Sequence, residues 1–466
     1  MVIALAALAG SLFAFSFEPL GFWFLAPISY ALLLRICQKG EHLYRSAFIF
    51  GFISSAITLW WAGKYVGLVP LAFLALLHGL FYLPLGLLAR YTRNIYWFIP
   101  AILAIEEVRS FFPFGGFSWM RIAFSQADAP YASVISIGGA LLLSAWVLAI
   151  SSIIATFKKK LAFPLLLIVA LPVLLNNSYS SQESVSFLGI QGNTPSIGLS
   201  FNDRAEAVFN LHLAETRRAA VTKADVIIWP ENAIDVDPYA NAGVRGSIES
   251  LTSTLRIPLI AGAITRQSGE LENVSLMYDE SGEVVSYYSK QYLTPFGEYM
   301  PLRSIARLVS PYVDDVVDFH VGDRVNNHLV DGQYLAPVIC YELLSDSLVQ
   351  RAARNSDALV VQTNSATFAG TSESSQQLQI TRLRALENAR EIASISTIGI
   401  SAHIDINGKV ISQTAENISA QIAGDLRSNS SRTVANILGL FAPGIVLLLA
   451  ILIPLFGLNR HKMSSR

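Results

Sequence analysis

The chain contains little cysteine and little charge, and both shortages restrict what it can be. Cys37 and Cys340 are the only cysteines among 466 residues, which excludes a disulfide-rich secreted scaffold. The sequence has no C-x-x-C and no H-E-x-x-H motif, so we expect no metal site and no cofactor. The formal net charge is −1 and no basic patch stands out, which argues against a nucleic-acid partner.

Charged residues make up 14% of the chain, against about 25% in ordinary soluble domains, and the deficit is uneven. Residues 1–178 are dominated by Leu, Ala, Ile, Phe and Trp, whereas residues 183–430 have a soluble composition. Residues 433–458 form another apolar run that is long enough to span a bilayer. We therefore predict a membrane domain, an inserted soluble domain, a C-terminal transmembrane helix and a tail at 459–466.

The membrane domain is expected to cross the bilayer about seven times. Its apolar segments lie near 2–16, 20–36, 47–62, 66–88, 95–108, 131–156 and 161–176. The first segment lacks a preceding basic region, so we expect a retained helix and not a cleaved signal peptide.

The placement of basic residues predicts the orientation of these segments. The basic clusters are "RICQKGEHLYR", "ARYTRN", "KKK" (158–160) and "NRHKMSSR". Seven crossings before residue 183 bring all four clusters to one side, which the positive-inside rule makes cytoplasmic. Both termini are then cytoplasmic and residues 183–430 lie outside. Cys37 and Cys340 are placed on opposite sides and cannot pair within one chain.

The soluble region alternates between strand and helix patterns. We predict strands in "SVSFLGIQG", "ADVIIWPEN", "IPLIAGAITR", "NVSLMYD", "EVVSYYSK", "YLAPVICYE", "DALVVQTNS", "ASISTIG", "SAHIDI" and "GKVIS". We predict helices in "DRAEAVFNLHLAETRRAAV", "SDSLVQRAARN" and "ESSQQLQITRLRALENAREI". This order favours an α/β fold with layered sheets.

Three polar residues follow apolar strands of this region: Glu231, Lys290 and Cys340. Taken singly, each has an ordinary structural role, as a turn acid, a solvated lysine or a packed thiol. Together they are typical of a catalytic site, because the ends of several strands can direct side chains from loops toward one point.

The motifs around these residues carry a resemblance to a known family. In their order and spacing, "IIWPENA" (227–233), "SKQYLTPFGEYMP" (289–301) and "PVICYELL" (337–344) resemble the nitrilase, or carbon–nitrogen hydrolase, superfamily. "LTPFGEYMPL", "GGFSWMRIAFSQADAP" (115–130), "QGNTPS" and "QLQITRLRALENAR" resemble the apolipoprotein N-acyltransferase family. The resemblance covers nearly the whole chain. It implies a polytopic α-helical membrane domain with an external nitrilase-like domain, an α-β-β-α layered sandwich.

The resemblance implies a Glu–Lys–Cys triad. Glu231 would be the general base and acid, Lys290 the oxyanion stabiliser and Cys340 the nucleophile. Lys290 would also favour the thiolate through its charge. The supporting residues would be Glu298, Tyr341 and Glu342.

The same resemblance implies a reaction in a bacterial plasma membrane. The acyl donor would be a membrane phospholipid, and the acceptor the α-amine of the diacylglyceryl-modified N-terminal cysteine of an apolipoprotein. The candidates for lining the substrate access route are Phe117, Trp119 and Phe201. Phe201 stands where the family often has tryptophan, and "NSATFAG" (364–370) replaces a motif close to N-D-A-W-F-G.

Other classes of protein remain open at the level of the sequence. A membrane-anchored amidase or nitrilase would use the same triad with water as the acceptor. A transporter or receptor would use charges inside the membrane, for which the candidates are Glu18, Lys64, Glu106 and Glu107. A Cys-His protease would need a partner for Cys340 among His320, His328 and His403.

Overall fold

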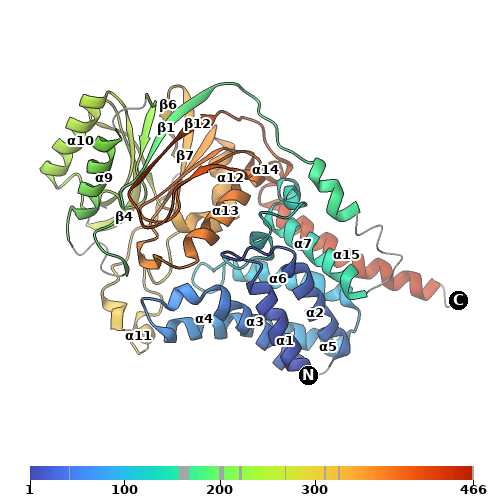
Figure 1. Ribbon diagram of the computed structural model, residues 1–466. Coiled ribbons are helices and arrows are strands. Elements are labelled where there is room, and N and C mark those ends of the chain that lie inside the picture. The colour runs from blue at the N-terminus through green and yellow to red at the C-terminus, as the bar shows by residue number, and fades with distance from the viewer. Residues whose placement is uncertain are drawn as a thin grey trace. The chain divides into compact units, whose positions relative to one another are not determined.

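A computed structural model describes residues 1–40, 42–156, 167–198, 204–219, 223–267, 269–308, 311–323 and 326–463. The chain divides into two compact units (Figure 1). The first unit comprises Met1–Asn176 with Thr433–Arg466, and the second unit comprises Asn177–Arg432. The predicted access residue Phe201 and the basic cluster 158–160 lie outside the described residues.

The first unit is built from helices. They are α1 (Val2–Ala14), α2 (Leu25–Lys39), α3 (Leu43–Thr58), α4 (Leu68–Phe81), α5 (Leu83–Tyr91), α6 (Phe98–Arg109), α7 (Ile135–Thr156), α14 (Val434–Leu438) and α15 (Phe441–Met463). Among the described residues, two helical stretches are long and apolar enough to cross a membrane, namely Leu68–Tyr91 and Ala132–Thr156.

Two apolar segments that look continuous in the sequence are interrupted in the structure. The segment at 66–88 forms α4 and α5, which meet at Tyr82. Pro84 in the first turn of α5 has no N–H to continue the hydrogen bonding of α4. The run at 433–458 breaks after α14, because Gly439 adopts a φ of 55° and a ψ of −129°, a conformation that ends the helix.

The second unit contains two six-stranded sheets. The first has the order β12-β1-β2-β3-β4-β5 and the second the order β11-β10-β9-β8-β7-β6. The strands of the first sheet are β1 (Ser184–Gln191), β2 (Val226–Ile228), β3 (Leu259–Gln267), β4 (Glu270–Tyr278), β5 (Val284–Ser289) and β12 (Ala420–Arg427). Those of the second are β6 (His328–Val330), β7 (Gln333–Ile339), β8 (Ala358–Thr363), β9 (Ile392–Ser396), β10 (Ala402–Ile404) and β11 (Val410–Gln413).

Both sheets are mixed. In the first sheet, β1, β2 and β3 are parallel, while β4 and β5 continue antiparallel from β3. β1 also pairs antiparallel with β12 along its whole length, from Ser184 opposite Arg427 to Gln191 opposite Ala420. In the second sheet, β7, β8 and β9 are parallel and the outer strands are antiparallel.

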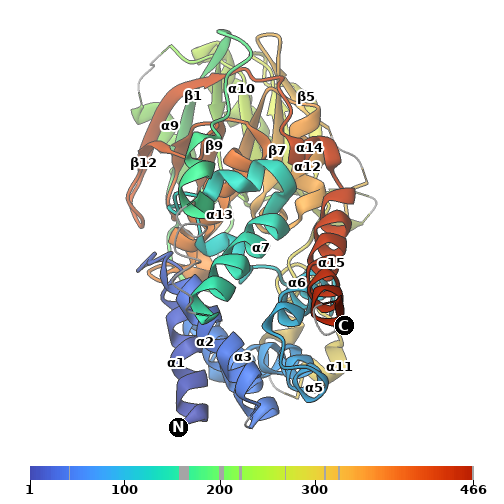
Figure 2. The ribbon, with the colours of Figure 1, turned by 90° about the vertical axis from the view of Figure 1, so that its right-hand side faces the viewer.

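The two sheets pack face to face, and helices cover their outer faces (Figures 1 and 2). Phe187 and Ile228 of the first sheet share a buried cluster with Val360 and Ile395 of the second. On the outer side of the first sheet, α9 (Ala207–Arg218) and α10 (Ala242–Leu255) pack on a second apolar cluster. α12 (Asp346–Arg354) and α13 (Glu373–Asn388) pack on the second sheet. The expected α-β-β-α sandwich is therefore confirmed.

Candidate active site

Cys340 lies on a sharp turn at the end of β7. The strand buries an apolar run up to Ile339, and the chain then enters the short 3-10 helix η9 (Cys340–Leu344). Cys340 has a φ of 49°, a left-handed conformation that costs a non-glycine residue roughly 1–2 kcal/mol. Cys340 is partly exposed as a residue, whereas Tyr341 and Glu342 beside it are buried. Strain of this kind persists where the surroundings hold the backbone in place.

Glu342 supplies that restraint. Its Oε2 accepts a hydrogen bond from the backbone N–H of Ile339 at 2.7 Å. Its Oε1 accepts from the backbone N–H of Gln291 at 2.6 Å and from the hydroxyl of Tyr288 at 2.8 Å. Burial raises the pKa of Glu342 to about 7. Glu342 therefore joins the turn at Cys340 to the segment that carries Lys290. Beside it, the ring of Tyr341 stacks on Tyr292 with centroids 5.2 Å apart.

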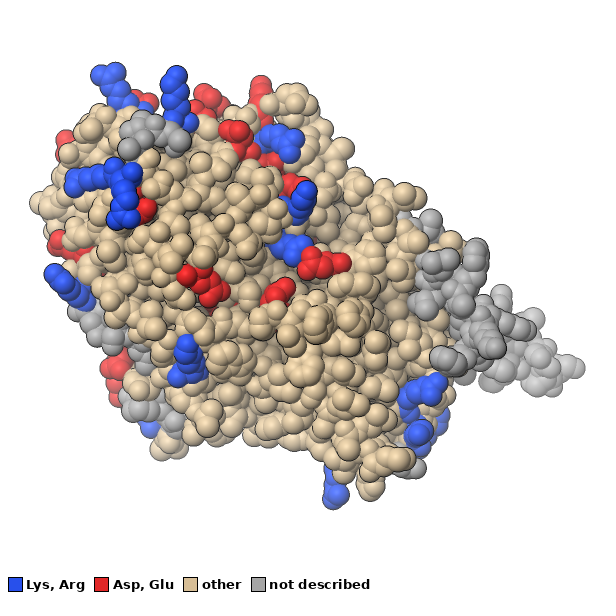
Figure 3. Space-filling view, viewed as in Figure 1, with Lys and Arg blue, Asp and Glu red and all other residues tan. Residues whose placement is uncertain are grey.

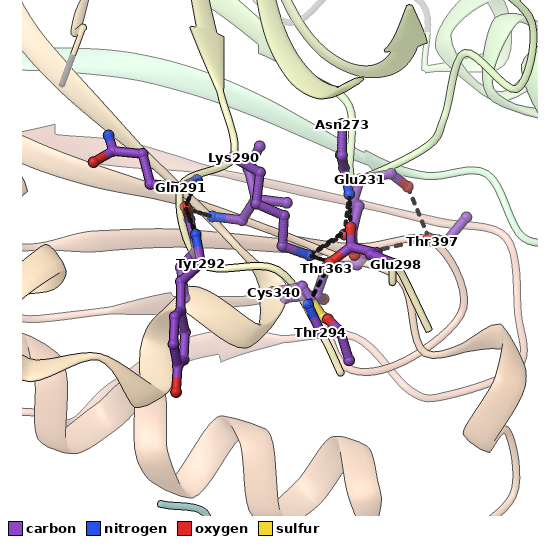
Figure 4. A network of polar contacts seen from close by, with 12 residues as sticks. Glu231, Asn273, Lys290, Gln291, Tyr292, Thr294, Glu298, Cys340, Thr363 and Thr397 are labelled. Atoms are coloured by element: carbon purple, nitrogen blue, oxygen red, sulfur yellow. Dashed lines mark hydrogen bonds and ion pairs between the residues drawn. The ribbon is translucent and has the colours of Figure 1, made fainter. Parts of the chain in front are cut away.

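Lys290 brings two of the predicted carboxylates together (Figure 4). Its Nζ lies 3.1 Å from Oε1 of Glu231 and 2.9 Å from Oε2 of Glu298. The lysine side chain is 1% exposed, so its charge depends on these partners instead of water. Burial by itself lowers the pKa of Lys290, but the two carboxylates reverse this effect and raise the pKa above its ordinary value. Lys290 is therefore an ammonium ion at neutral pH.

Asn273 on β4 is a member of this network that the sequence analysis missed. Its Nδ2 donates to Oε1 of Glu231 at 2.8 Å and to Oε1 of Glu298 at 2.7 Å (Figure 4). The backbone N–H of Thr294 donates to Oε2 of Glu298 at 2.7 Å. The available signal was an amide side chain at the start of the apolar pattern "NVSLMYD", in the strand that precedes the one leading to Lys290.

The backbone at Glu231 is packed closely against β3. A Cβ added at Gly262 would lie 2.4 Å from the carbonyl oxygen of Pro230 and 2.6 Å from Cα of Glu231. The hydroxyl of Thr397 donates to the carbonyl oxygen of Glu231 at 3.4 Å. Trp229 is fully buried, and its Nε1 donates to the hydroxyl of Thr216 at 2.9 Å. These contacts fix the backbone position from which the side chain of Glu231 extends.

The electrostatic environment of Cys340 holds its sulfur as a thiol. Burial and the carboxylate of Glu231 raise the pKa of Cys340 well above its ordinary value, and Lys290 offsets them only in part. The expectation that Lys290 stabilises a thiolate is therefore right in sign, but the opposing effects are larger. Nε2 of Gln377 on α13 lies 3.6 Å from Sγ and donates to it. A nucleophilic role for Cys340 would therefore require a nearby base to take the proton of the thiol.

The aromatic access candidates that the structure describes lie in the first unit. Trp119 is 4% exposed, and its ring centroid lies 5.0 Å from that of Trp61. Phe117 stacks on Trp119 with centroids 6.4 Å apart. A lining role for Phe117 and Trp119 stays a prediction.

Residues that supported the competing classes have other partners. Oε1 of Glu106 accepts from the backbone N–H of Ile122 at 2.6 Å, and Glu107 forms an ion pair with Arg121. The histidines named for a Cys-His pair also contact other groups. His320 lies 2.8 Å from Glu270, His328 lies 2.9 Å from Ser275, and His403 lies 3.0 Å from Glu391.

Comparison with known families is decisive for the second unit. Residues 190–436 match the model of the carbon-nitrogen hydrolase family. The chain belongs to this family. Residues 9–153 match the model described as the apolipoprotein N-acyltransferase N-terminal domain.

Curated relatives match nearly the whole chain. It is 28% identical to the apolipoprotein N-acyltransferase of Mycolicibacterium smegmatis, over 99% of this chain and 86% of the relative. It is 29% identical to that of Pseudomonas paraeruginosa, over 88% of this chain and 86% of the relative. Among solved structures, a carbon-nitrogen hydrolase superfamily protein from Xanthomonas campestris matches at 15% identity with a TM-score of 0.40, covering 53% of this chain and 91% of that one.

Proposed function

We propose that the chain transfers an acyl group from a membrane phospholipid to the α-amine of the diacylglyceryl-modified N-terminal cysteine of apolipoproteins. The observation that carries this proposal is the presence of two matching domains in one chain. An N-terminal domain of the apolipoprotein N-acyltransferase type precedes the carbon-nitrogen hydrolase domain. A membrane-anchored amidase would need only a membrane anchor and the carbon-nitrogen hydrolase domain. It would not need an N-terminal domain of the apolipoprotein N-acyltransferase type.

The proposal includes an arrangement in the bacterial plasma membrane. Residues 1–178 would cross the bilayer about seven times and residues 433–458 once more, with both termini in the cytoplasm. Residues 183–430 would form the extracytoplasmic catalytic domain. The uneven charge supports this arrangement: in Figure 3 charged side chains gather over the second unit, while the surface over α3 and α4 is mostly uncharged.

In the first half-reaction, the sulfur of Cys340 attacks the ester carbonyl carbon of the phospholipid, and Glu231 takes the thiol proton. The ammonium of Lys290 and the backbone N–H of Tyr341 stabilise the oxyanion. Loss of one such donor typically raises the barrier by roughly 3–4 kcal/mol. The carbon–oxygen bond then breaks, Glu231 returns the proton to the lysophospholipid, and a thioester remains on Cys340.

In the second half-reaction, the neutral α-amine of the acceptor attacks the thioester carbonyl carbon. Glu231 takes a proton from the attacking nitrogen, and the carbon–sulfur bond breaks. The thiolate of Cys340 then recovers that proton from Glu231. The network supports these roles, because Lys290 forms ion pairs with both Glu231 and Glu298.

A lipid donor also requires a route from the bilayer to the site. A diacyl phospholipid is scarcely present as a monomer in water, so the catalytic site must open toward the membrane. We propose that Phe117 and Trp119 line this route. Aromatic side chains suit the membrane interface, where one end of the ring is apolar and the other is hydrated.

Substitution of the nucleophile tests the proposed function. Cells whose sole copy is Cys340→Ala should produce lipoproteins that lack the amide-linked acyl chain, as measured by mass spectrometry of their N-terminal peptides. Cys37→Ala is the matched control and should retain transfer, because Cys37 is a buried residue of α2. The proposal fails if lipoproteins from the Cys340→Ala cells still carry the amide-linked chain. A thioester on Cys340 after incubation with phospholipid alone would exclude a simple amidase.

A further inference from the structure

A buried acid lies on the helix side of the nucleophile and has no role in the mechanism described so far. α13 begins at Glu373, and one turn later Gln377 donates its amide N–H to the sulfur of Cys340. Residues four apart lie on the same face of a helix, about 6 Å from each other along its axis. Glu373 is 3% exposed and Gln377 is 6% exposed. The first turn of α13 therefore presents a buried carboxyl group on the face that carries the contact to the sulfur.

Small hydroxyl groups surround this carboxyl group. Ser374 and Ser365 both hydrogen-bond to Glu373. A Cβ added at Gly399 would lie within 3 Å of the hydroxyl oxygens of Ser365, Ser374 and Ser396. Ser365 lies in the segment "NSATFAG", at the position where the resembling family has aspartate in its N-D-A-W-F-G motif.

The charges near Cys340 favour a cationic ligand. Lys290 is shared between Glu231 and Glu298, so this group keeps one excess negative charge. Ionised Glu373 adds another, and its charge contributes to the raised pKa of Cys340. Burial raises the pKa of Glu373 itself to about 7, although hydrogen bonds from Ser365 and Ser374 oppose the rise. Glu373 can therefore take up or release a proton at neutral pH.

We propose that Glu373 binds the ammonium form of the acceptor's N-terminal amine beside the thioester and takes the proton that must leave before attack. This inference rests on the proposed function. A free α-amine has an ordinary pKa of about 8, so most acceptor molecules arrive as ammonium ions at neutral pH. An ammonium nitrogen has no lone pair for attack on a carbonyl carbon.

The proton transfers balance. The first N–H proton moves from the ammonium ion to the carboxylate of Glu373, which leaves a neutral amine. The nitrogen lone pair forms the new carbon–nitrogen bond, and the second proton moves to Glu231. When the carbon–sulfur bond breaks, Cys340 takes that proton from Glu231, and Glu373 releases the first proton to water. The net products are the amide, the free thiol and one proton.

The test separates the two half-reactions in the full-length protein in proteoliposomes. Glu373→Gln keeps the size of the side chain and removes its charge. Thioester formation with phospholipid alone should change less than twofold. Transfer from the preformed thioester to a synthetic peptide with a diacylglyceryl N-terminal cysteine should fall at least tenfold at pH 7. The difference in transfer rate between the wild type and Glu373→Gln should narrow by pH 9, where most of the amine is neutral. Glu373→Asp should recover part of the transfer rate that Glu373→Gln loses.

The pH profile is measured on the thioester so that Cys340 does not titrate. The remaining acids facing Glu373 are Glu231 and Glu416. Glu280→Gln removes an exposed acid in the turn between β4 and β5; it is the matched control and should transfer like the wild type. Equal slowing of both half-reactions by Glu373→Gln would indicate that Glu373 has a structural role. An unchanged dependence of the transfer rate on pH would indicate that Glu373 has no role in transfer. Either result overturns the inference while leaving the proposed function intact. A wild-type protein that forms no thioester would overturn both.

Discussion

Carboxylates outnumber cations around Cys340, and this excess determines the resting state of its sulfur. Glu231, Glu298 and Glu373 each disfavour a negative charge there, and Lys290 opposes them. The resting site therefore does not hold a thiolate of Cys340 paired with the ammonium group of Lys290. In the proposed mechanism the proton leaves the sulfur as the new carbon–sulfur bond forms, so the position of Glu231 matters more than the acidity of the thiol.

The raised pKa of Cys340 predicts how its alkylation depends on pH. A thiol with a raised pKa has little thiolate at neutral pH, and its reaction rate rises as pH approaches that pKa. The rate of iodoacetamide addition to Cys340, followed by mass spectrometry in a Cys37→Ala background, should increase from pH 7 to pH 9.5 without a plateau. A plateau below pH 8 would instead indicate a stable thiolate.

At the scale of elements, the sequence predicts the strands that carry the triad better than it predicts the network around them. Glu231, Lys290 and Cys340 all follow strands whose apolar runs are clear in the sequence. Asn273 and Gln377 lie within other elements, and their contacts arise only when both sheets and α13 are packed. Single-sequence patterns contain no information about those distances.

Among the described residues of the second unit, α10, β6 and β12 are elements that the sequence analysis did not predict. α10 has the sequence "AGVRGSIESLTSTL", in which glycine, serine and threonine weaken the helical pattern. β6 has three residues. β12 alternates between buried and exposed positions but includes Gly424 and Asp425, which are uncommon in strands. In each case tertiary packing outweighs local preference.

The close approach of β3 to Glu231, the proposed general base, predicts a large effect of Gly262→Ala on activity. The added methyl group would collide with backbone atoms of Pro230 and Glu231, so β3 and the segment that carries Glu231 would have to move apart. Thioester formation should fall at least tenfold, because small displacements of catalytic groups cost about 100-fold in rate.

Gly246→Ala in α10 is the control, since nothing lies within 4 Å of the added Cβ. It should leave thioester formation unchanged and slightly stabilise the helix. Thermal unfolding in detergent shows whether Gly262→Ala retains its fold. If the folded Gly262→Ala protein forms the thioester at the wild-type rate, Glu231 does not depend on this contact.

For the whole molecule, the inserted position of the second unit predicts which parts of the chain are accessible from outside the cell. Gln182, which is exposed next to β1, can be replaced by cysteine in a background without Cys37 and Cys340. In intact cells a membrane-impermeant maleimide should label Gln182→Cys. The tail variant Ser465→Cys should react only after permeabilisation. The opposite labelling pattern would reverse the proposed topology.

The pairing of β1 with β12 has a consequence for biogenesis. Residues 184–191 leave the ribosome about 230 residues before their antiparallel partner, residues 420–427. At roughly 5–20 residues per second, β1 waits some 10–50 s with one edge unpaired. A chain that stops before residue 420 would keep this edge open permanently, exposing it to aggregation or proteolysis. The first sheet of the second unit can therefore be completed only after the chain has been synthesised through residue 427.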